Sequence, residues 1–182
     1  MQLSRLARVL SFVGALGASP CEAAAAEPVR PHAERVASYT LHARLDAEGH
    51  RISAKGTIEL VNFTETALSE LYFHLYMNAF KNDKSLFMRS PFGAGRSGDH
   101  GKEWGFIDVK RLFARELSSE LWPARSPTSP GDPNDETNLR VPLERPLEPG
   151  KSLTLDVEFE VQLPWIVERT GYVSDYHFVA QW

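Results

Sequence analysis

The sequence predicts an all-β fold, an antiparallel β-sandwich with long irregular loops. Apolar and polar residues alternate with period two in several short runs, as they do in strands that bury only one face. Turn-forming residues separate these runs, and beyond the N-terminus no segment has the three-to-four-residue repeat of an amphipathic helix. About seven short strands connected by such turns are typical of a sandwich.

The N-terminus has the layout of a cleavable signal peptide. Arg5 and Arg8 precede an apolar run at residues 9–18, and small residues follow at 23–26. A positive start, a short apolar run and a small-residue cleavage site are the three parts of such a signal. We therefore expect residues 1–25 to be removed on export, which leaves the mature protein periplasmic or secreted.

The mature chain is expected to have a linker at residues 26–35 and a single domain at residues 36–182. Cys21, the only cysteine, is lost with the signal, so a disulfide cannot stabilise this domain. The formal net charge is −4 and the two signs are interspersed, which excludes the basic surface that nucleic-acid binding requires. No segment is apolar for the length of a bilayer, so no transmembrane helix is expected.

The first three strands are predicted by clear alternation. Residues 39–46 and 52–61 flank a turn at 48–50 and should form an antiparallel hairpin, each strand half-buried. Residues 68–76 form the third strand, with Tyr72 on the face opposite the inward apolar residues. Between the second and third strands, Asn62-Phe63-Thr64 has the form of a glycosylation acceptor, but in this place it predicts turn chemistry.

The rest of the chain alternates between irregular segments and strands. Residues 78–103 and the proline-rich residues 122–135 are expected to lack regular structure. A loop as long as the first of these is uncommon inside a compact domain, so it is either functional or packed against something outside the chain. Further strands are expected at residues 104–113, 139–143 (broken by Pro142), 153–161 and 172–182. Because the last strand runs to the final residue, we expect a truncated chain.

No complete catalytic site is expected. The six histidines share no close spacing and no H-E-x-x-H helix is present, so the chain is not expected to bind a metal. His42 and His50 should lie on the solvent side of the first hairpin. Residues 93–98 match G-x-G-x-x-G in letters only, because neither the preceding strand nor the following helix of a dinucleotide site is predicted.

Gln181 is the polar residue that stands out. It follows apolar residues at the end of the last predicted strand, and a buried amide must be hydrogen-bonded. It either bonds a neighbouring backbone group or faces a ligand held between this domain and another; both readings stay open on the residues alone. By contrast, Asp156, Glu158 and Glu160 alternate with apolar residues and are expected on a solvated strand face rather than in a paired-carboxylate site.

Several segments resemble the N-terminal β-domain of the M1-family zinc metallopeptidases (aminopeptidase N-like). The most specific is Leu75-Tyr76-Met77-Asn78-Ala79-Phe80, supported by residues 39–46 and 56–58. Residues 104–109, 132–135 and Val179-Ala180-Gln181-Trp182 are similar to pieces of bacterial members. The resemblance covers residues 36–182.

The resemblance implies a saddle of β-strands that packs on a thermolysin-like catalytic domain further along the polypeptide. That domain would carry an H-E-x-x-H helix and a later glutamate, and zinc is expected there rather than in this chain. In the family, a glutamine near the end of the N-terminal domain lines the pocket for the first side chain and free amine of a peptide, and Gln181 matches its place. The chain by itself is expected to have no peptidase activity.

Two other functions stay open. The chain could be a stand-alone exported β-sandwich module that binds protein or carbohydrate, or its parent could have lost the zinc ligands. A module predicts no large exposed apolar patch, whereas a domain made to pack on another predicts an apolar face around Trp165, Phe178 and Trp182.

Overall fold

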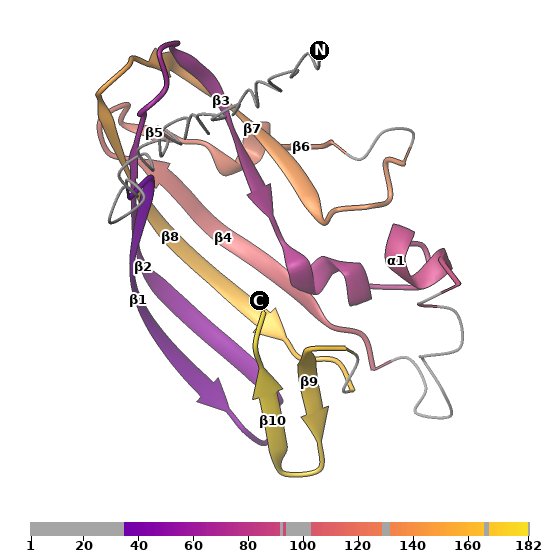
Figure 1. Ribbon diagram of the computed structural model, residues 1–182. Coiled ribbons are helices and arrows are strands. Elements are labelled where there is room, and N and C mark those ends of the chain that lie inside the picture. The colour runs from indigo at the N-terminus through magenta and orange to yellow at the C-terminus, as the bar shows by residue number, and fades with distance from the viewer. Residues whose placement is uncertain (1–34, 92, 94–102, 129–131, 166–167, 182) are drawn as a thin grey trace, which may run out of the picture. The chain divides into compact units, whose positions relative to one another are not determined.

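The computed structural model describes residues 35–91, 93, 103–128, 132–165 and 168–181, and the predicted signal peptide lies outside them. Five strands form a large antiparallel sheet in the order β1-β2-β8-β4-β5 (Figure 1). Their bounds are Ala37–Asp46 (β1), Arg51–Val61 (β2), Ser152–Gln162 (β8), Phe106–Ala114 (β4) and Ser119–Glu120 (β5). The predicted antiparallel all-β class is confirmed.

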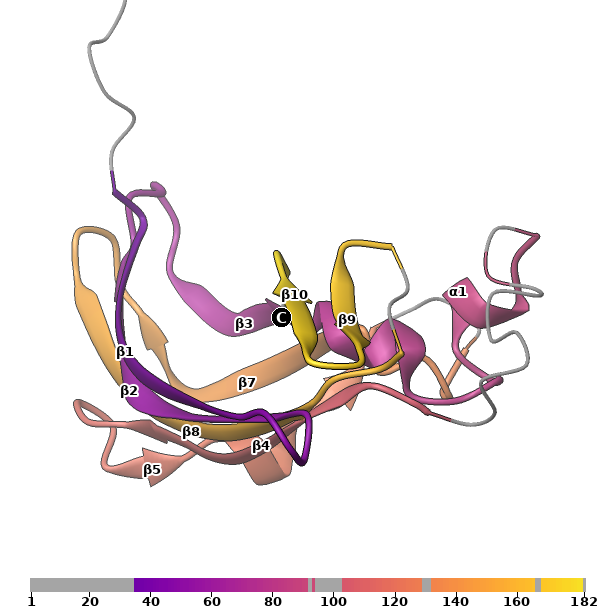
Figure 2. The same cartoon turned by 90° about the horizontal axis from the view of Figure 1, so that it is seen from below.

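The remaining strands form two further sheets. A small antiparallel sheet has the order β3-β7-β6 and consists of Leu68–His74 (β3), Asn138–Leu147 (β7) and Ser126–Pro127 (β6). A separate hairpin pairs Thr170–Val173 (β9) with Tyr176–Val179 (β10). Figure 2 shows β3, β7 and this hairpin on one side of the large sheet.

The first hairpin is the predicted one. β1 and β2 pair without interruption from Ala37↔Leu60 to Asp46↔Arg51. At Gly56 the two backbones approach so closely that a Cβ would lie 1.9 Å from the carbonyl oxygen of Thr40. Only glycine fits this position of β2 without displacing β1.

The main core lies between the large and small sheets. Leu153, Leu155 and Val157 point inward from β8 and are covered by Leu71 of β3 and Val141 of β7. Burying each such side chain stabilises the fold by about 1.5–3 kcal/mol. The alternate residues of β8 carry the predicted carboxylates, of which Glu158 and Glu160 are exposed. That solvated face is confirmed.

β1 differs from its prediction as a half-buried strand. Leu41 is half-buried, but Tyr39 is 64% and Leu45 46% exposed. β1 is the edge of the large sheet, and its inner face is left largely uncovered. The sequence of β1 therefore alternates as predicted, but the burial that this alternation predicts is not found.

The sequence predicts a short strand at residues 139–143 that is broken by Pro142, and the structure differs from this prediction. β7 runs for ten residues through it. The ladder with β3 is shifted there, because Glu70 opposes Pro142 while Leu68 opposes Leu147. An irregularity of this kind accommodates a residue that has no N–H to donate.

The predicted single strand at residues 172–182 is instead the hairpin β9–β10. Its turn is Ser174-Asp175, with a positive φ of 52° at Ser174. Neither residue is glycine, so the apolar run reads as continuous in the sequence.

The expectation of no helix after the N-terminus is also wrong. The described residues include one short α-helix, Leu86–Arg89 (α1), and two 3₁₀-helices, Tyr76–Phe80 (η1) and Trp122–Ala124 (η2). α1 and η2 lie in segments predicted to be irregular, whereas η1 begins at the end of the predicted third strand. α1 begins at Ser85, whose Oγ accepts the N–H of Met88 at 3.2 Å and donates to the carbonyl of Ala79 at 2.5 Å. A four-residue helix held by such contacts has no periodicity for a sequence pattern to detect.

Asn62 confirms the predicted turn chemistry between β2 and β3. The residue is 1% exposed. Its Nδ2 donates to the carbonyls of Thr66 at 2.9 Å and Leu147 at 2.8 Å, and its Oδ1 accepts the N–H and the hydroxyl of Thr64 at 3.0 and 2.7 Å. With its amide used in this way, the side chain serves the turn.

Candidate functional site

Gln181, the predicted substrate-binding residue, follows the hairpin β9–β10. It is half-buried. The backbone just before it is held by the N–H of Ala180, which donates to the carbonyl of Arg169 at 3.1 Å. Among the described residues, the side-chain amide of Gln181 takes part in no hydrogen bond, so the backbone partner considered from the sequence is not found there.

An aromatic and imidazole cluster joins this hairpin to the end of the large sheet. The ring of His50 stacks on Tyr172 of β9, with centroids 3.5 Å apart and planes 7° from parallel. Nδ1 of His50 lies 3.0 Å from Nε2 of His177 on β10. The hydroxyl of Tyr172 donates to Glu103 at 2.9 Å, and burial, followed by this hydrogen bond, raises the pKa of Tyr172.

The cluster corrects two expectations. His50 is half-buried against the hairpin rather than standing on the solvent side. It also lies beside a second histidine, although the spacing of the six histidines predicts no such proximity. The two residues are 127 positions apart, so no local signal could have brought them together.

Of the other histidines, His42 matches its prediction. His42 is exposed on β1, and His74 is exposed with Nδ1 2.8 Å from the amide oxygen of Asn138. His32 and His100 lie outside the described residues. In the part of the chain that the structure describes, no group of three His, Cys, Asp or Glu side chains is placed to hold a metal ion.

An apolar groove of about 560 Å³ lies on the described part of the domain. We call it the β1–β3 groove because it runs over the inner face of the large sheet from the edge strand β1 to β3, the edge of the small sheet. Among its lining residues are Leu41, Ile58, Phe73, Val109, Phe159 and Trp122.

One rim of the β1–β3 groove is held by a polar cluster. Tyr72 of β3 is 64% exposed, and its hydroxyl donates to Glu70. Arg140 of β7 also donates to Glu70. The hydrogen bond from Tyr72, and then that from Arg140, lowers the pKa of Glu70. The carboxylate is therefore kept charged and fixes the tyrosine ring along the rim.

The apolar face predicted around Trp165, Phe178 and Trp182 is found in part. Phe178 is 40% exposed. Trp165 is half-buried and packs edge-on against Tyr172, with centroids 5.8 Å apart. Trp182 lies outside the described residues. Sequence reasoning missed the β1–β3 groove, because alternation on β1 does not tell whether a second layer covers the strand.

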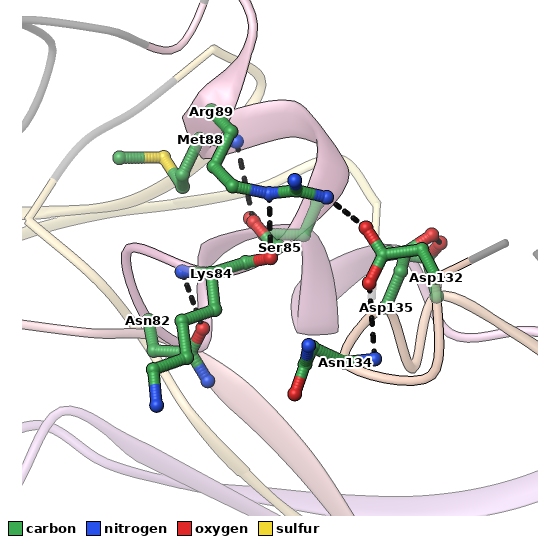
Figure 3. Close-up of polar contacts among 10 residues, drawn as sticks. Asn82, Lys84, Ser85, Met88, Arg89, Asp132, Asn134 and Asp135 are labelled. Carbon is green, nitrogen blue, oxygen red and sulfur yellow. Dashed lines mark hydrogen bonds and ion pairs between the residues drawn. The ribbon is translucent and has the colours of Figure 1, made fainter.

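A second polar cluster links α1 to the segment before β7. This segment contains residues 132–135, for which the sequence resembles bacterial members of the family. Figure 3 shows Arg89 of α1 reaching Asp132, with which it forms an ion pair. The other oxygen of Asp132 accepts the N–H of Asn134 at 3.0 Å, and Arg89 also donates to the carbonyl of Lys84 at 3.0 Å. These groups satisfy one another. The cluster therefore reads as a structural connection and not as a ligand site.

The G-x-G-x-x-G match falls mostly outside the described residues. Its first glycine, Gly93, packs against α1, where a Cβ would lie 2.2 Å from the carbonyl oxygen of Phe87. Close packing on a helix explains that glycine without a nucleotide. Within the described ranges, no helix has the length and apolar character needed to cross a membrane.

Comparison with known protein families finds no matching family model, and no curated protein matches the chain.

Proposed function

We propose that this chain is the N-terminal, non-catalytic β-domain of an exported M1-type zinc aminopeptidase. It packs on a catalytic domain and helps to shape the pocket for the N-terminus of a peptide. The observation that carries the proposal is the uncovered β1–β3 groove, which leaves apolar side chains of β1, β2 and β3 open to a partner. The family resemblance over residues 36–182 names the partner.

Gln181 supplies the proposed contact with substrate. A protonated peptide amine needs hydrogen-bond acceptors, and the side-chain oxygen of a glutamine provides one. The half-buried position of Gln181 leaves its amide partly accessible, while the neighbouring bond from Ala180 to Arg169 limits the movement of its backbone. The residue therefore acts by binding and orientation.

Zinc chemistry is not assigned to this chain. The described residues offer the pair His50 and His177 but no third converging ligand, so they do not fit a catalytic zinc site. In the proposed protein the zinc, its activation of water and the proton transfers belong to the catalytic domain. Proteolytic chemistry is thus a property of the whole enzyme.

The first test is to read the coding frame beyond the codon for Trp182. A continuous frame that encodes H-E-x-x-H and a later glutamate supports the proposal. A stop codon there refutes it for this product and favours the alternative, a stand-alone exported binding module.

The role of Gln181 is tested in the full-length enzyme with aminoacyl 4-nitroanilides. Loss of a hydrogen bond to a charged group costs about 1.5–3 kcal/mol, so Gln181→Ala should lower kcat/KM by about ten- to a hundredfold. Asn82→Ala removes another half-buried side-chain amide, whose Oδ1 accepts the N–H of Lys84, and should leave kcat/KM unchanged. Equal effects of the two variants would refute a substrate-binding role.

Docking through the β1–β3 groove is tested by two substitutions on one strand. Leu41 lines the groove, while Thr40 is exposed and lines the opposite face of the large sheet. A charge buried against a partner is costly, so Leu41→Lys should weaken association of this domain with the separately expressed catalytic domain. Thr40→Lys should not. If Leu41→Lys binds as well as wild type, the groove is not the docking surface.

A further inference from the structure

The turn between β1 and β2 places an imidazole in a fixed position. His50 has a φ of 50°, in the left-handed region that histidine tolerates better than most residues. Its carbonyl oxygen accepts the N–H of Leu163 at 2.9 Å and the side-chain amide of Gln162 at 3.2 Å. The backbone of His50 is thereby tied to the end of β8, and its ring contacts the hairpin β9–β10.

The contact between the two imidazoles has the geometry of a hydrogen bond. The nitrogens are 3.0 Å apart and the ring centroids 5.2 Å apart. The centroid separation is nearly the nitrogen separation extended by the two ring radii, so the nitrogens of His50 and His177 point at each other. Rings that share a metal ion point instead at a third position. The contact is therefore an N–H···N bond.

Such a bond depends on protonation. One of the facing nitrogens must carry hydrogen and the other must offer a lone pair. The bond survives addition of one proton to the pair, because a charged imidazole can still donate to a neutral one. Addition of the second proton places two N–H groups and two positive charges face to face, and the bond is lost.

We propose that the His50–His177 bond is a proton-dependent latch. It holds the hairpin β9–β10 against the end of the large sheet while at least one imidazole is neutral, and it releases the hairpin when both are protonated. That the latch also positions Gln181, which follows the hairpin, rests on the proposed function.

Histidine is the side chain that ordinarily changes charge between pH 5 and 8. Tyr172 stays a neutral hydrogen-bond donor in this range, because burial and the bond to Glu103 raise its pKa. Among the described residues, the polar and charged groups next to the pair are Tyr172 of β9, Glu103 before β4, Gln162 of β8 and Arg51 of β2, which donates to Gln162.

The bond itself can be observed by NMR on the ¹⁵N-labelled full chain. At pH 8 a scalar coupling across the hydrogen bond should connect Nδ1 of His50 with Nε2 of His177. At pH 5 the coupling should disappear. Absence of the coupling at both pH values overturns the latch.

Release of the hairpin is measured by hydrogen exchange of residues 170–179, corrected for the intrinsic effect of pH. Exchange should rise about tenfold between pH 7.5 and pH 5 in the wild type, the factor expected for loss of one hydrogen bond. His177→Asn should exchange quickly at both pH values and show no step, while His42→Asn, which changes an exposed histidine on β1, should keep the step.

Protection of the β8 amides shows whether each variant is folded. If His177→Asn does not fold, the wild-type step and the NMR coupling decide the question. A wild type without a step, or a folded His177→Asn that keeps it, overturns the proposal. None of these measurements requires peptidase activity, so the latch and the proposed function can fail independently.

Discussion

Replacing Asn62 with alanine should be among the most damaging single substitutions in this domain. The side chain makes four hydrogen bonds, two donated by Nδ2 and two accepted by Oδ1. At about 1 kcal/mol net for each bond, their loss costs about 4 kcal/mol. Thr64 lies near solvent and can regain partners in water, whereas the carbonyl of Leu147 is buried and cannot. We therefore expect a loss of about 3–4 kcal/mol.

Urea unfolding followed by tryptophan fluorescence measures this loss directly. For a chain of this size, about 3 kcal/mol corresponds to a fall in Tm of roughly 6–12 °C. A matched substitution, Asn62→Asp, keeps the volume but places a carboxylate oxygen opposite the carbonyls of Thr66 and Leu147. At pH 7, Asn62→Asp should lower the free energy of unfolding by more than Asn62→Ala does.

The pH dependence of the Asn62→Asp variant has a definite sign. Burial and the facing carbonyls favour the protonated carboxyl, so the pKa of the new group is raised on folding. The penalty is absent below the unfolded-state pKa, where the group is protonated in both states, and is complete once the pH exceeds the folded-state pKa. A loss below about 1 kcal/mol for Asn62→Ala, or a penalty for Asn62→Asp that does not grow with pH, would refute the view that the amide bonds hold this turn.

Three further outcomes are expected. Gly56→Ala should destabilise the chain by about 1–3 kcal/mol in urea, because the new methyl group lies 1.9 Å from the carbonyl oxygen of Thr40; an unchanged midpoint would contradict the close approach. The ion pair with Arg115 lowers the pKa of Asp156, so its small stabilisation should be present at neutral pH and be lost as the pH falls through the folded-state pKa. Asp156→Asn should reduce the loss of stability that occurs as the pH falls. An unchanged loss would show that other groups cause it. Ser85→Ala should cost about 1 kcal/mol by removing the cap of α1, visible as faster hydrogen exchange at Met88.

The parts of the fold that the sequence predicts are those whose signal is local. The hairpin β1–β2 and the two faces of β8 follow from alternation within single segments, and a turn of polar residues joins the first pair. The apolar residues 153–161 occupy the inner face because their period matches the pleat of a strand. No partner strand needs to be known for either inference.

The features that the sequence does not predict depend on contacts between distant segments. The open face of β1 could not be foreseen, because burial of Leu41 or Tyr39 depends on a second layer rather than on its own strand. The β9–β10 turn at Ser174 lacks glycine or proline and is hidden inside an apolar run. The pairing of His50 with His177 joins residues 127 positions apart, and no spacing rule reports such a contact.

For the candidate site, the sequence supplies Gln181 and the structure supplies its setting. The half-buried amide lies beyond a hairpin that the sequence does not predict, and the β1–β3 groove emerges only from the arrangement of two sheets. The exposure predicted for Phe178 is found, at 40%. A residue type can thus suggest a role, while the surface that partners use is a property of tertiary structure.

The open edge of β1 has a consequence for the handling of the protein in solution. Its ten residues include no lysine and no proline, and its pairing with β2 has no bulge, so of the features that oppose edge-to-edge aggregation this strand has the charges of Arg44 and Asp46 alone. Association of two copies along β1 would accelerate with concentration, whereas docking onto a domain of the same polypeptide would not. Refolding yield should therefore rise on dilution, and a covalently attached partner would protect this strand even in a crowded compartment.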